Sequence, residues 1–341
     1  MPEPVLSLRD LVVEFSTEDG IVHAVNDISY DVHPGETLGI VGESGSGKSV
    51  SQLAILGLIP QPPGRIVQGE AILNGRDLLK MGKKQLRDVR GGEVAMIFQD
   101  PMTSLNPVLK IGYQLAEAVR AHQNVSAKAA RERGIYLLDL VGVPNPERRF
   151  DQYPHEFSGG MRQRAMIAMA IANEPKLLIA DEPTTALDVT IQAQIIEVLK
   201  AAQGETNAAI ILITHDLGLV AELADRVAVM YAGRVVEMGD VHTIFAAPRH
   251  PYTVGLMLSV PRIELDRGVL EPIPGQPPSM ITPPPGCAFH PRCYLSEGRS
   301  VCRTDIPEQK RVGTSDHVSA CHFADELEQK QVAPLEEALP S

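Results

Sequence analysis

Short apolar runs alternate with longer amphipathic stretches along most of this chain. Mixed apolar and polar positions over residues 4–15 and 21–32 predict two strands, and a polar hairpin-like piece is expected over residues 69–75. Nearly continuous apolar runs, typical of strands buried on both faces, follow at residues 36–41, 93–98, 176–180, 209–213 and 227–231. The pattern over about residues 105–169 is helical. Strands that alternate with helices in this way predict an α/β fold built on a mostly parallel sheet.

The character of the chain changes after about residue 247. Seven prolines between Pro272 and Gly286 exclude regular structure there, and the acidic, Gln- and Ala-rich stretch from Asp325 is expected to be disordered. We therefore predict four parts, which are a main domain at residues 1–250 with a helical subdomain at about 103–172, a proline-rich linker at 251–286, a small irregular lobe at 287–323 and a tail at 324–341.

Composition narrows the class of protein. The 341 residues suffice for one large domain or two smaller ones, and an apolar content of 44% supports a proper core. A net charge of −12 argues against a general nucleic-acid binder. No apolar run approaches the roughly 18 residues that span a bilayer, and the first residues lack the basic and apolar regions of a signal peptide. We therefore expect a cytoplasmic protein.

A glycine-rich loop follows the apolar run at residues 36–41. It reads Gly42, Glu43, Ser44, Gly45, Ser46, Gly47, Lys48 and Ser49, which fills every fixed position of G-x-x-x-x-G-K-[ST] before a predicted helix. The glycines let successive backbone N–H groups point inward as an anion nest at the helix N-terminus. Lys48 would neutralise the β- and γ-phosphates, and the Ser49 hydroxyl would ligate Mg²⁺. A glycine-rich turn into an ordinary helix is the alternative, but the complete motif in this context predicts a site for a nucleoside triphosphate.

Two carboxylates end the apolar run at residues 176–180. Asp181 and Glu182 come directly after it, at the edge of an open α/β sheet where ligands bind. Asp181 would hold Mg²⁺, directly or through water. Glu182 would act as the general base that activates the attacking water.

Between these two elements stands the segment from Phe157 to Arg164. Ser158 would begin a helix, and Gly159 and Gly160 free the backbone N–H groups to approach an anion. Here the chain resembles the ATP-binding cassette (ABC) family of transporter ATPases, whose signature is usually Leu-Ser-Gly-Gly-Gln; this chain has Phe for Leu and Met for Gln. The resemblance implies an ABC nucleotide-binding domain with the P-loop fold. It also implies that Ser158 to Gly160 complete the ATP site of a partner cassette in a head-to-tail dimer.

The resemblance implies roles for further residues. Gln99 matches the family glutamine that contacts Mg²⁺ and the lytic water, and links that site to the helical subdomain. His215 matches the histidine that reaches the γ-phosphate, and Asp188 ends the dimer-contact loop. Phe15 is the candidate for stacking on adenine, with His23 as a poorer alternative.

Longer motifs are similar to the oligopeptide and dipeptide importer branch of the family, and they lie at residues 98–107, 157–164, 250–253 and 273–278. The similarity implies an ATPase subunit that powers peptide import and works at the cytoplasmic face of the inner membrane as a peripheral protein. The implied partners are a second ABC ATPase subunit (a heterodimer is favoured), two transmembrane permease subunits and an extracytoplasmic peptide-binding protein, with no nucleic acid. Nickel importers share these motifs and stay open as an alternative.

Two other classes are weaker alternatives. A soluble cassette ATPase acting on ribosomes or DNA typically has two cassettes, a coiled-coil insertion or a basic arm, none of which the sequence shows. A regulatory cassette that does not hydrolyse ATP would not need Glu182 and His215.

Four cysteines lie in the predicted C-terminal lobe, at Cys287, Cys293, Cys302 and Cys321. Disulfides are not expected in a cytoplasmic chain. Structural zinc is the default from chemistry alone, yet the C-x₂₋₄-C pairs of zinc sites are missing. The wider spacing suits a 4Fe–4S cubane, which the resemblance also implies; zinc and free thiols stay open. Three histidines near the cysteines could replace one of them, namely His290, His317 and His322.

Overall fold

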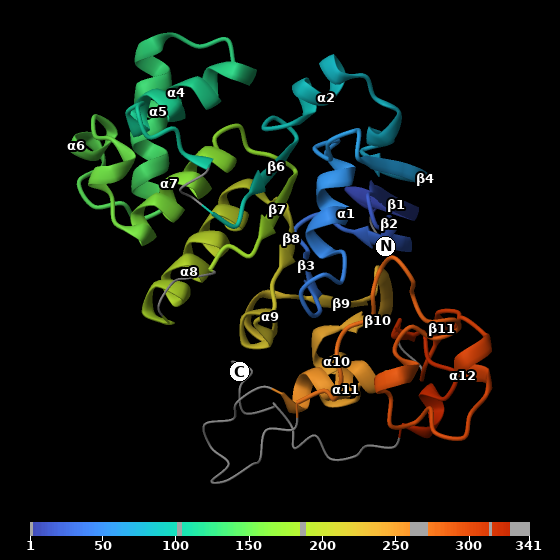
Figure 1. Cartoon of the computed structure of the whole chain (residues 1–341). Coiled ribbons are helices and arrows are strands. Elements are labelled where there is room, and N and C mark those ends of the chain that lie inside the picture. Colours follow the sequence, from blue (N-terminus) through green and yellow to red (C-terminus); the bar gives the residue numbers. More distant parts are fainter. Residues whose placement is uncertain (1–2, 101–103, 185–188, 260–271, 314–315, 328–341) are drawn as a thin grey trace. The chain divides into compact units, whose positions relative to one another are not determined.

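The computed structural model describes residues 3–100, 104–184, 189–259, 272–313 and 316–327. The chain divides into two units, each made of segments from different parts of the sequence (Figure 1). Unit 1 consists of Met1–Leu6, Asp31–Thr37 and Ile72–Ile213, and unit 2 consists of Ser7–Tyr30, Leu38–Ala71 and Thr214–Ser341.

Three parallel strands form the sheet of unit 1. They are β6 (Val94–Ile97), β7 (Leu177–Asp181) and β8 (Ala209–Ile213), with β7 paired to both of the others. Every residue of β7 and β8 is buried. Continuous apolar sequence of this kind fits parallel strands that are covered on both faces, so these predicted strands are confirmed.

Helices supply the rest of unit 1 (Figure 1). The longer ones are α2 (Lys83–Val89), α4 (Ile111–His122), α5 (Ala127–Leu140), α6 (Pro146–Phe150), α7 (Gly159–Ala170) and α8 (Val189–Thr206). The helical pattern expected from about residue 105 to 169 is therefore present as α4 to α7. The Phe150 ring packs against Gly112 of α4 and Gly134 of α5. A Cβ placed on these glycines would lie only 2.0 and 2.6 Å from atoms of that ring.

Two sheets contribute strands to unit 2. The first contains β1 (Leu6–Thr17), β2 (Gly20–Val32) and β4 (Gly64–Leu73) in the order β2-β1-β4. In the second, β3 (Thr37–Val41) runs parallel to β9 (Arg226–Tyr231), and antiparallel pairing continues through β10 (Arg234–Asp240), β12 (Val318–Ser319) and β11 (Lys310–Arg311). The expected piece at residues 69–75 is the end of β4 and the turn into β5 (Arg76–Asp77).

The remaining helices of unit 2 are α1 (Lys48–Ile55), α9 (Leu217–Leu223), α10 (Val241–Ala246), α11 (Pro251–Leu258) and α12 (Val301–Thr304), with short 3₁₀ turns η3 (His290–Arg292) and η4 (Ala324–Glu326). Helix α11 shows that regular structure continues to Leu258, into the segment predicted as a linker. The four-part division of the chain stays a prediction. Among the described residues, none of the helices has both the length and the apolar character needed to cross a membrane.

The C-terminal lobe contributes to the hydrophobic core of unit 2. Tyr231 from β9, Tyr252 from α11 and Phe289 from the C-terminal lobe are buried together, with ring centroids 4.6 to 5.4 Å apart. The Phe289 ring stands edge-on to Tyr231, an arrangement that aromatic quadrupoles favour. The C-terminal lobe is therefore packed against β9, the strand that runs parallel to β3.

Candidate nucleotide site

The glycine-rich loop connects β3 to α1, as the sequence predicts. Gly42 has φ 151° and Gly47 has φ 98°, a conformation that glycine adopts without strain. A Cβ on Gly42 would lie 2.1 Å from the Met230 carbonyl oxygen, and one on Gly47 would lie 2.4 Å from that of Ala24. Glycine is therefore required at both positions, because a side chain would collide with the neighbouring backbone and because the turn needs positive φ.

Lys48 is the first residue of α1 and is 6% exposed. Its Nζ donates to the carbonyl oxygen of Gly42 at 2.6 Å and to that of Glu43 at 3.0 Å, and reaches Ser46 Oγ at 3.4 Å. The ammonium group is thus held inside the curl of the loop, at the N-terminal end of a helix. Positive charge and helix N–H groups together favour a phosphate here.

The second predicted element lies at the end of β7 in unit 1. Asp181 is the last residue of the strand and is buried. Glu182 follows with φ 47°, and its N–H donates to the Ile213 carbonyl oxygen at 2.8 Å. Gln99, which follows β6, donates from Nε2 to Glu182 Oε2 at 2.9 Å. The structure therefore brings together two residues that the sequence analysis singled out separately.

The signature segment is a helix start, as expected. Ser158 is the N-cap of α7, where its hydroxyl accepts from the N–H of Met161 at 3.3 Å. Ser158 and Gly159 are exposed, whereas Gly160 is buried against Ile191. The start of α7 therefore lies at the protein surface.

The remaining predicted residues are placed as follows. His215 is exposed and follows Thr214, whose N–H donates to the Ile40 carbonyl oxygen of β3 at 3.3 Å. Phe15 is half-buried on β1, and His23 pairs with Glu14 at 3.2 Å. Residues 186–188, the expected dimer-contact loop, lie outside the described residues, so the role of Asp188 stays a prediction.

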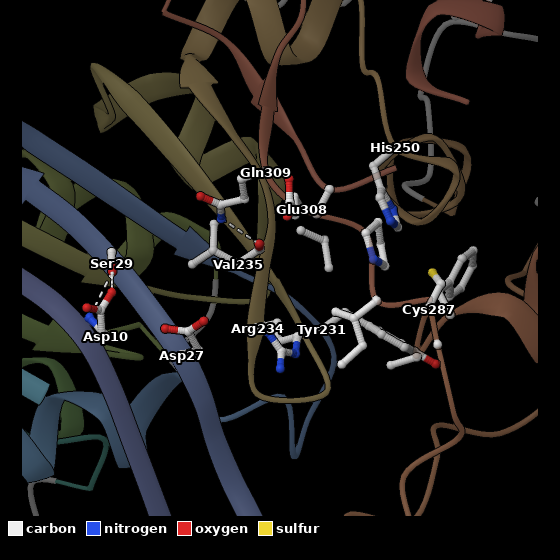
Figure 2. Close-up of a pocket in the computed structure, with 17 residues that line it drawn as sticks. Asp10, Asp27, Ser29, Tyr231, Arg234, Val235, His250, Cys287, Glu308 and Gln309 are labelled. Atoms are coloured by element: carbon white, nitrogen blue, oxygen red, sulfur yellow. Dashed lines mark hydrogen bonds between the residues drawn. The ribbon is translucent and has the colours of Figure 1, made fainter. Parts of the chain in front are cut away.

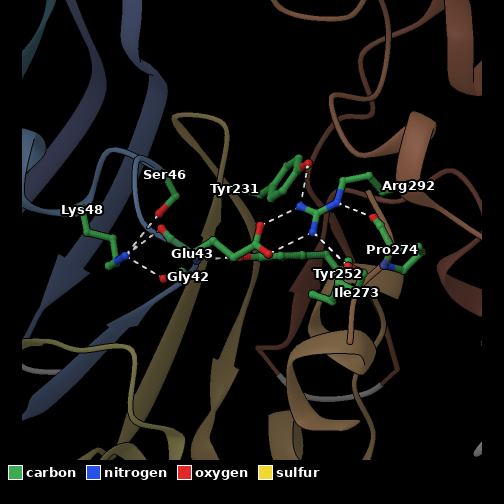
Figure 3. Close-up of polar contacts among 9 residues, drawn as sticks. All are labelled: Gly42, Glu43, Ser46, Lys48, Tyr231, Tyr252, Ile273, Pro274 and Arg292. Carbon is green, nitrogen blue, oxygen red and sulfur yellow. Dashed lines mark hydrogen bonds and ion pairs between the residues drawn. The ribbon is translucent and has the colours of Figure 1, made fainter. Parts of the chain in front are cut away.

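Sequence reasoning missed three side chains that surround the start of the loop (Figure 3). Arg292 donates to both carboxylate oxygens of Glu43, and the Glu43 N–H donates to the Tyr252 hydroxyl oxygen. Tyr231 accepts from the same guanidinium at 3.3 Å. Because 249 residues separate Glu43 from Arg292, no local pattern could have revealed the pair. The signals in the sequence were the motifs at residues 250–253 and 273–278, which contain Tyr252 and the Arg292 partner Pro274.

None of the four cysteines forms a disulfide in the structure. Burial raises the pKa of Cys287 to about 11 and that of Cys321 to about 12, and it also raises the pKa values of Cys293 and Cys302. In the described part of the chain, no three His, Cys, Asp or Glu side chains form a group that could hold a metal ion.

The three neighbouring histidines have other partners. His317 Nε2 lies 2.7 Å from a Glu237 carboxylate oxygen, and the other two face backbone oxygens, His290 that of Cys287 and His322 that of Asp305. The histidines are thus held by protein partners, and the cysteine centre stays a prediction.

A separate cavity of about 500 Å³ lies in unit 2 between β2, β10 and the C-terminal segment (Figure 2). Several of its polar groups bond one another. Ser29 Oγ donates to Asp10 Oδ1 at 3.0 Å, and Gln309 Nε2 donates to the Val235 carbonyl oxygen at 2.7 Å. None of the predicted nucleotide-binding residues lines this cavity, so we do not place the ATP chemistry there.

A glycine-rich loop at the start of a helix, with paired carboxylates after a buried parallel strand, defines a P-loop ATPase. Comparison with known proteins makes the class more specific. Residues 25–185 match the ABC transporter family, and residues 236–302 match the C-terminal region of oligopeptide/dipeptide transporters. A solved ATP-binding cassette, described as a dimer in a post-hydrolysis state bound to ADP and Pi, has the same fold; its TM-score is 0.62 at 24% identity, covering 69% of this chain and 98% of that one.

Individual relatives match over nearly the whole chain. The dipeptide transport ATP-binding protein DppD of Bacillus subtilis is 51% identical over 324 residues, which covers 95% of this chain and 96% of the relative. DppD of Escherichia coli is 53% identical over 319 residues, with 94% and 96% covered. The oligopeptide transport ATP-binding protein OppD of Bacillus subtilis is 56% identical over 286 residues, with 84% and 80% covered.

This chain therefore belongs to the ATP-binding subunits of ABC transporters, in their oligopeptide and dipeptide branch. It is an ATPase, and the expected ABC nucleotide-binding fold is confirmed.

Proposed function

We propose that this chain hydrolyses ATP to power the import of di- or oligopeptides through a membrane ABC transporter. The observation that carries the proposal is identity above 50% to dipeptide and oligopeptide transport subunits, extending through the C-terminal region. A nickel importer is the second candidate, because the motifs at residues 250–253 and 273–278 are shared with that group.

The loop residues Gly42 to Ser49 bind the phosphates in this proposal, and Phe15 stacks on adenine. Hydroxyl, carboxylate and amide oxygens suit a hard cation, so Ser49, Asp181 and Gln99 are the proposed Mg²⁺ ligands. Bound Mg²⁺ would neutralise charge on the phosphate oxygens.

Glu182 accepts the proton of the attacking water, and Gln99 holds its carboxylate in position through the 2.9 Å hydrogen bond. Lys48 and His215 stabilise charge on the γ-phosphate.

A second cassette completes the catalytic unit. Ser158, Gly159 and Gly160 would contact ATP bound to the loop of a partner ATPase chain, which agrees with the exposure of Ser158 and Gly159. We favour a heterodimer with a homologous chain. Two permease subunits and an extracytoplasmic peptide-binding protein would complete the importer, with this chain peripheral at the cytoplasmic face of the membrane.

We also retain a 4Fe–4S cluster on Cys287, Cys293, Cys302 and Cys321 as a proposal, with zinc as the alternative. Its support is the family resemblance and the wide cysteine spacing, since a cubane presents its iron corners in divergent directions. It does not rest on any metal geometry in the structure. Such a cluster would supply folding energy to the lobe.

Reconstitution tests the proposed function. The chain is copurified with its partners, inserted into vesicles, and assayed for ATP-dependent uptake of labelled di- and tripeptides against labelled nickel ions. A Glu182→Gln chain is the matched control for uptake that does not depend on hydrolysis. Peptide uptake by the parent supports the proposal, whereas uptake of nickel alone, or copurification with ribosomal proteins instead of permeases, would overturn it.

A further inference from the structure

The second residue of the phosphate loop is held by the C-terminal lobe. Arg292 Nη1 lies 2.6 Å from Glu43 Oε2, and Arg292 Nη2 lies 3.0 Å from Glu43 Oε1 (Figure 3). This is the two-pronged arrangement in which a planar guanidinium matches a carboxylate in geometry as well as charge. A loop formed near the start of the chain is thereby tied to a residue close to its end.

Contacts other than Glu43 also hold Arg292 in place. The side chain is only 4% exposed, its Nε donates to the Pro274 carbonyl oxygen at 2.8 Å, and its Nη1 also reaches the Tyr231 hydroxyl at 3.3 Å. The guanidinium lies 5.9 Å from the centre of the Phe289 ring. These contacts restrict the Arg292 guanidinium, so it loses little conformational entropy when it binds the Glu43 carboxylate.

Glu43 is held at three points. Its carboxylate is bound by Arg292, its N–H donates to the buried Tyr252 hydroxyl at 2.7 Å, and its carbonyl oxygen accepts from Lys48 Nζ at 3.0 Å. One residue thus connects the lobe directly to the Lys48 ammonium group, which is proposed to bind the phosphates.

We propose that Arg292 is a positioning residue for the ATPase reaction, which acts through Glu43 to keep the phosphate loop and Lys48 in the shape that binds ATP. The inference rests on the proposed role of Gly42 to Ser49 as the phosphate site. A loop ordered before the ligand arrives loses less freedom on binding, so its affinity is higher.

Removing the guanidinium would have a specific consequence. Arg292→Met leaves the Glu43 carboxylate beside the loop without its partner, where its negative charge opposes the phosphates. We expect the KM for ATP to rise about tenfold, the effect of about 1.4 kcal/mol of lost binding free energy, while kcat at saturating ATP stays within about twofold. Replacing Glu43 by Gln in the same chain removes that charge but does not restore the contact. The double variant should therefore recover part of the affinity and match Glu43→Gln alone.

The experiment compares the parent, Arg292→Met, Glu43→Gln and the double variant as full chains in the assembled transporter. ATPase rates over a range of ATP concentrations give KM and kcat, and a fluorescent ATP analogue gives affinity directly. Arg311→Met is the matched control, because Arg311 in the same lobe makes an exposed ion pair with Asp316 at 2.7 Å. Should Arg292→Met fail to fold, Arg292→Lys keeps the charge without the fork and is measured in its place.

Each outcome has a defined meaning. A raised KM for Arg292→Met, with a double variant that matches Glu43→Gln alone, supports the inference. A KM within twofold of the parent would overturn it and leave Arg292 with a structural role only. So would equal increases in KM from Arg292→Met in the parent and in the Glu43→Gln chain. Lys48→Ala tests the proposed phosphate site independently of Arg292. A chain that still binds ATP with this substitution would contradict the assignment of Gly42 to Ser49 as that site.

Discussion

Gln99 donates a hydrogen bond to Glu182 at 2.9 Å, although 83 residues separate them in the sequence. Each follows one of two neighbouring parallel strands, β6 and β7. Glu182 has the left-handed backbone value φ 47°, which is uncommon for a residue with a side chain. The bond from its N–H to the Ile213 carbonyl oxygen holds it there. The Glu182 carboxylate is thus fixed at the sheet edge where ligands of α/β proteins bind.

The first prediction concerns hydrolysis. Glu182→Gln keeps the size of the side chain and removes the base, so turnover should fall by about 10²-fold or more while ATP binding is retained. Steady-state ATPase rates and nucleotide affinity of the assembled transporter check both parts. Turnover within a few-fold of the parent would exclude Glu182 as the general base.

The second prediction concerns the exposed start of α7. Ser158→Arg places a bulky charge at this N-terminus, so it should reduce hydrolysis in the assembled transporter and leave this chain's own ATP affinity nearly unchanged. Nucleotide binding to the isolated chain and ATPase rates of the complex provide the comparison. An isolated variant that no longer binds ATP would instead indicate that the segment serves its own loop.

The sequence predicts those features that local residue types encode. Gly42 and Gly47 are required by positive φ and by close backbone neighbours, so the loop appears as a contiguous motif. The strand before Asp181 is likewise encoded by a contiguous run of apolar residues. The contact between Glu43 and Arg292 is not, because it depends on how β9, α11 and the lobe pack around Tyr231. No periodicity along the chain carries that information.

The third prediction measures how strongly the lobe is joined to unit 2. Phe289→Ala removes a buried ring that contacts Tyr231 and Tyr252, and should lower the free energy of unfolding by about 3–5 kcal/mol. Denaturant unfolding checks the value. Ile306→Ala, at a position in the same lobe that is 54% exposed, is the control and should cost less than about 1 kcal/mol. Equal losses in the two variants would contradict a shared core.

The fourth prediction concerns alkaline pH. Burial raises the pKa of Tyr30 above its ordinary value of 10.0, and the hydrogen bond from Gln52 offsets this only in part. Above the ordinary pKa of 10.0, the unfolded chain releases the Tyr30 proton while the folded chain keeps it. The folded state therefore loses stability as the pH rises through this range. Tyr30→Phe should reduce the loss between about pH 9 and 11 by about 1.4 kcal/mol. Urea unfolding at both pH values is the measurement, and parallel losses in parent and variant would contradict the prediction.

The last prediction concerns the four cysteines. Burial first, and for Cys287, Cys293 and Cys321 also the neighbouring cysteines, raise their pKa values and so disfavour thiolates. A bound metal centre would reverse that balance, because coordination requires deprotonated sulfur and contributes folding energy. Chain purified without oxygen should therefore be brown and contain about four irons, and Cys302→Ser should remove the colour and make the lobe sensitive to proteolysis. One equivalent of zinc in a colourless preparation would support the zinc alternative, and metal-free chain with a protease-resistant lobe would show that the packing around Phe289 suffices without a metal.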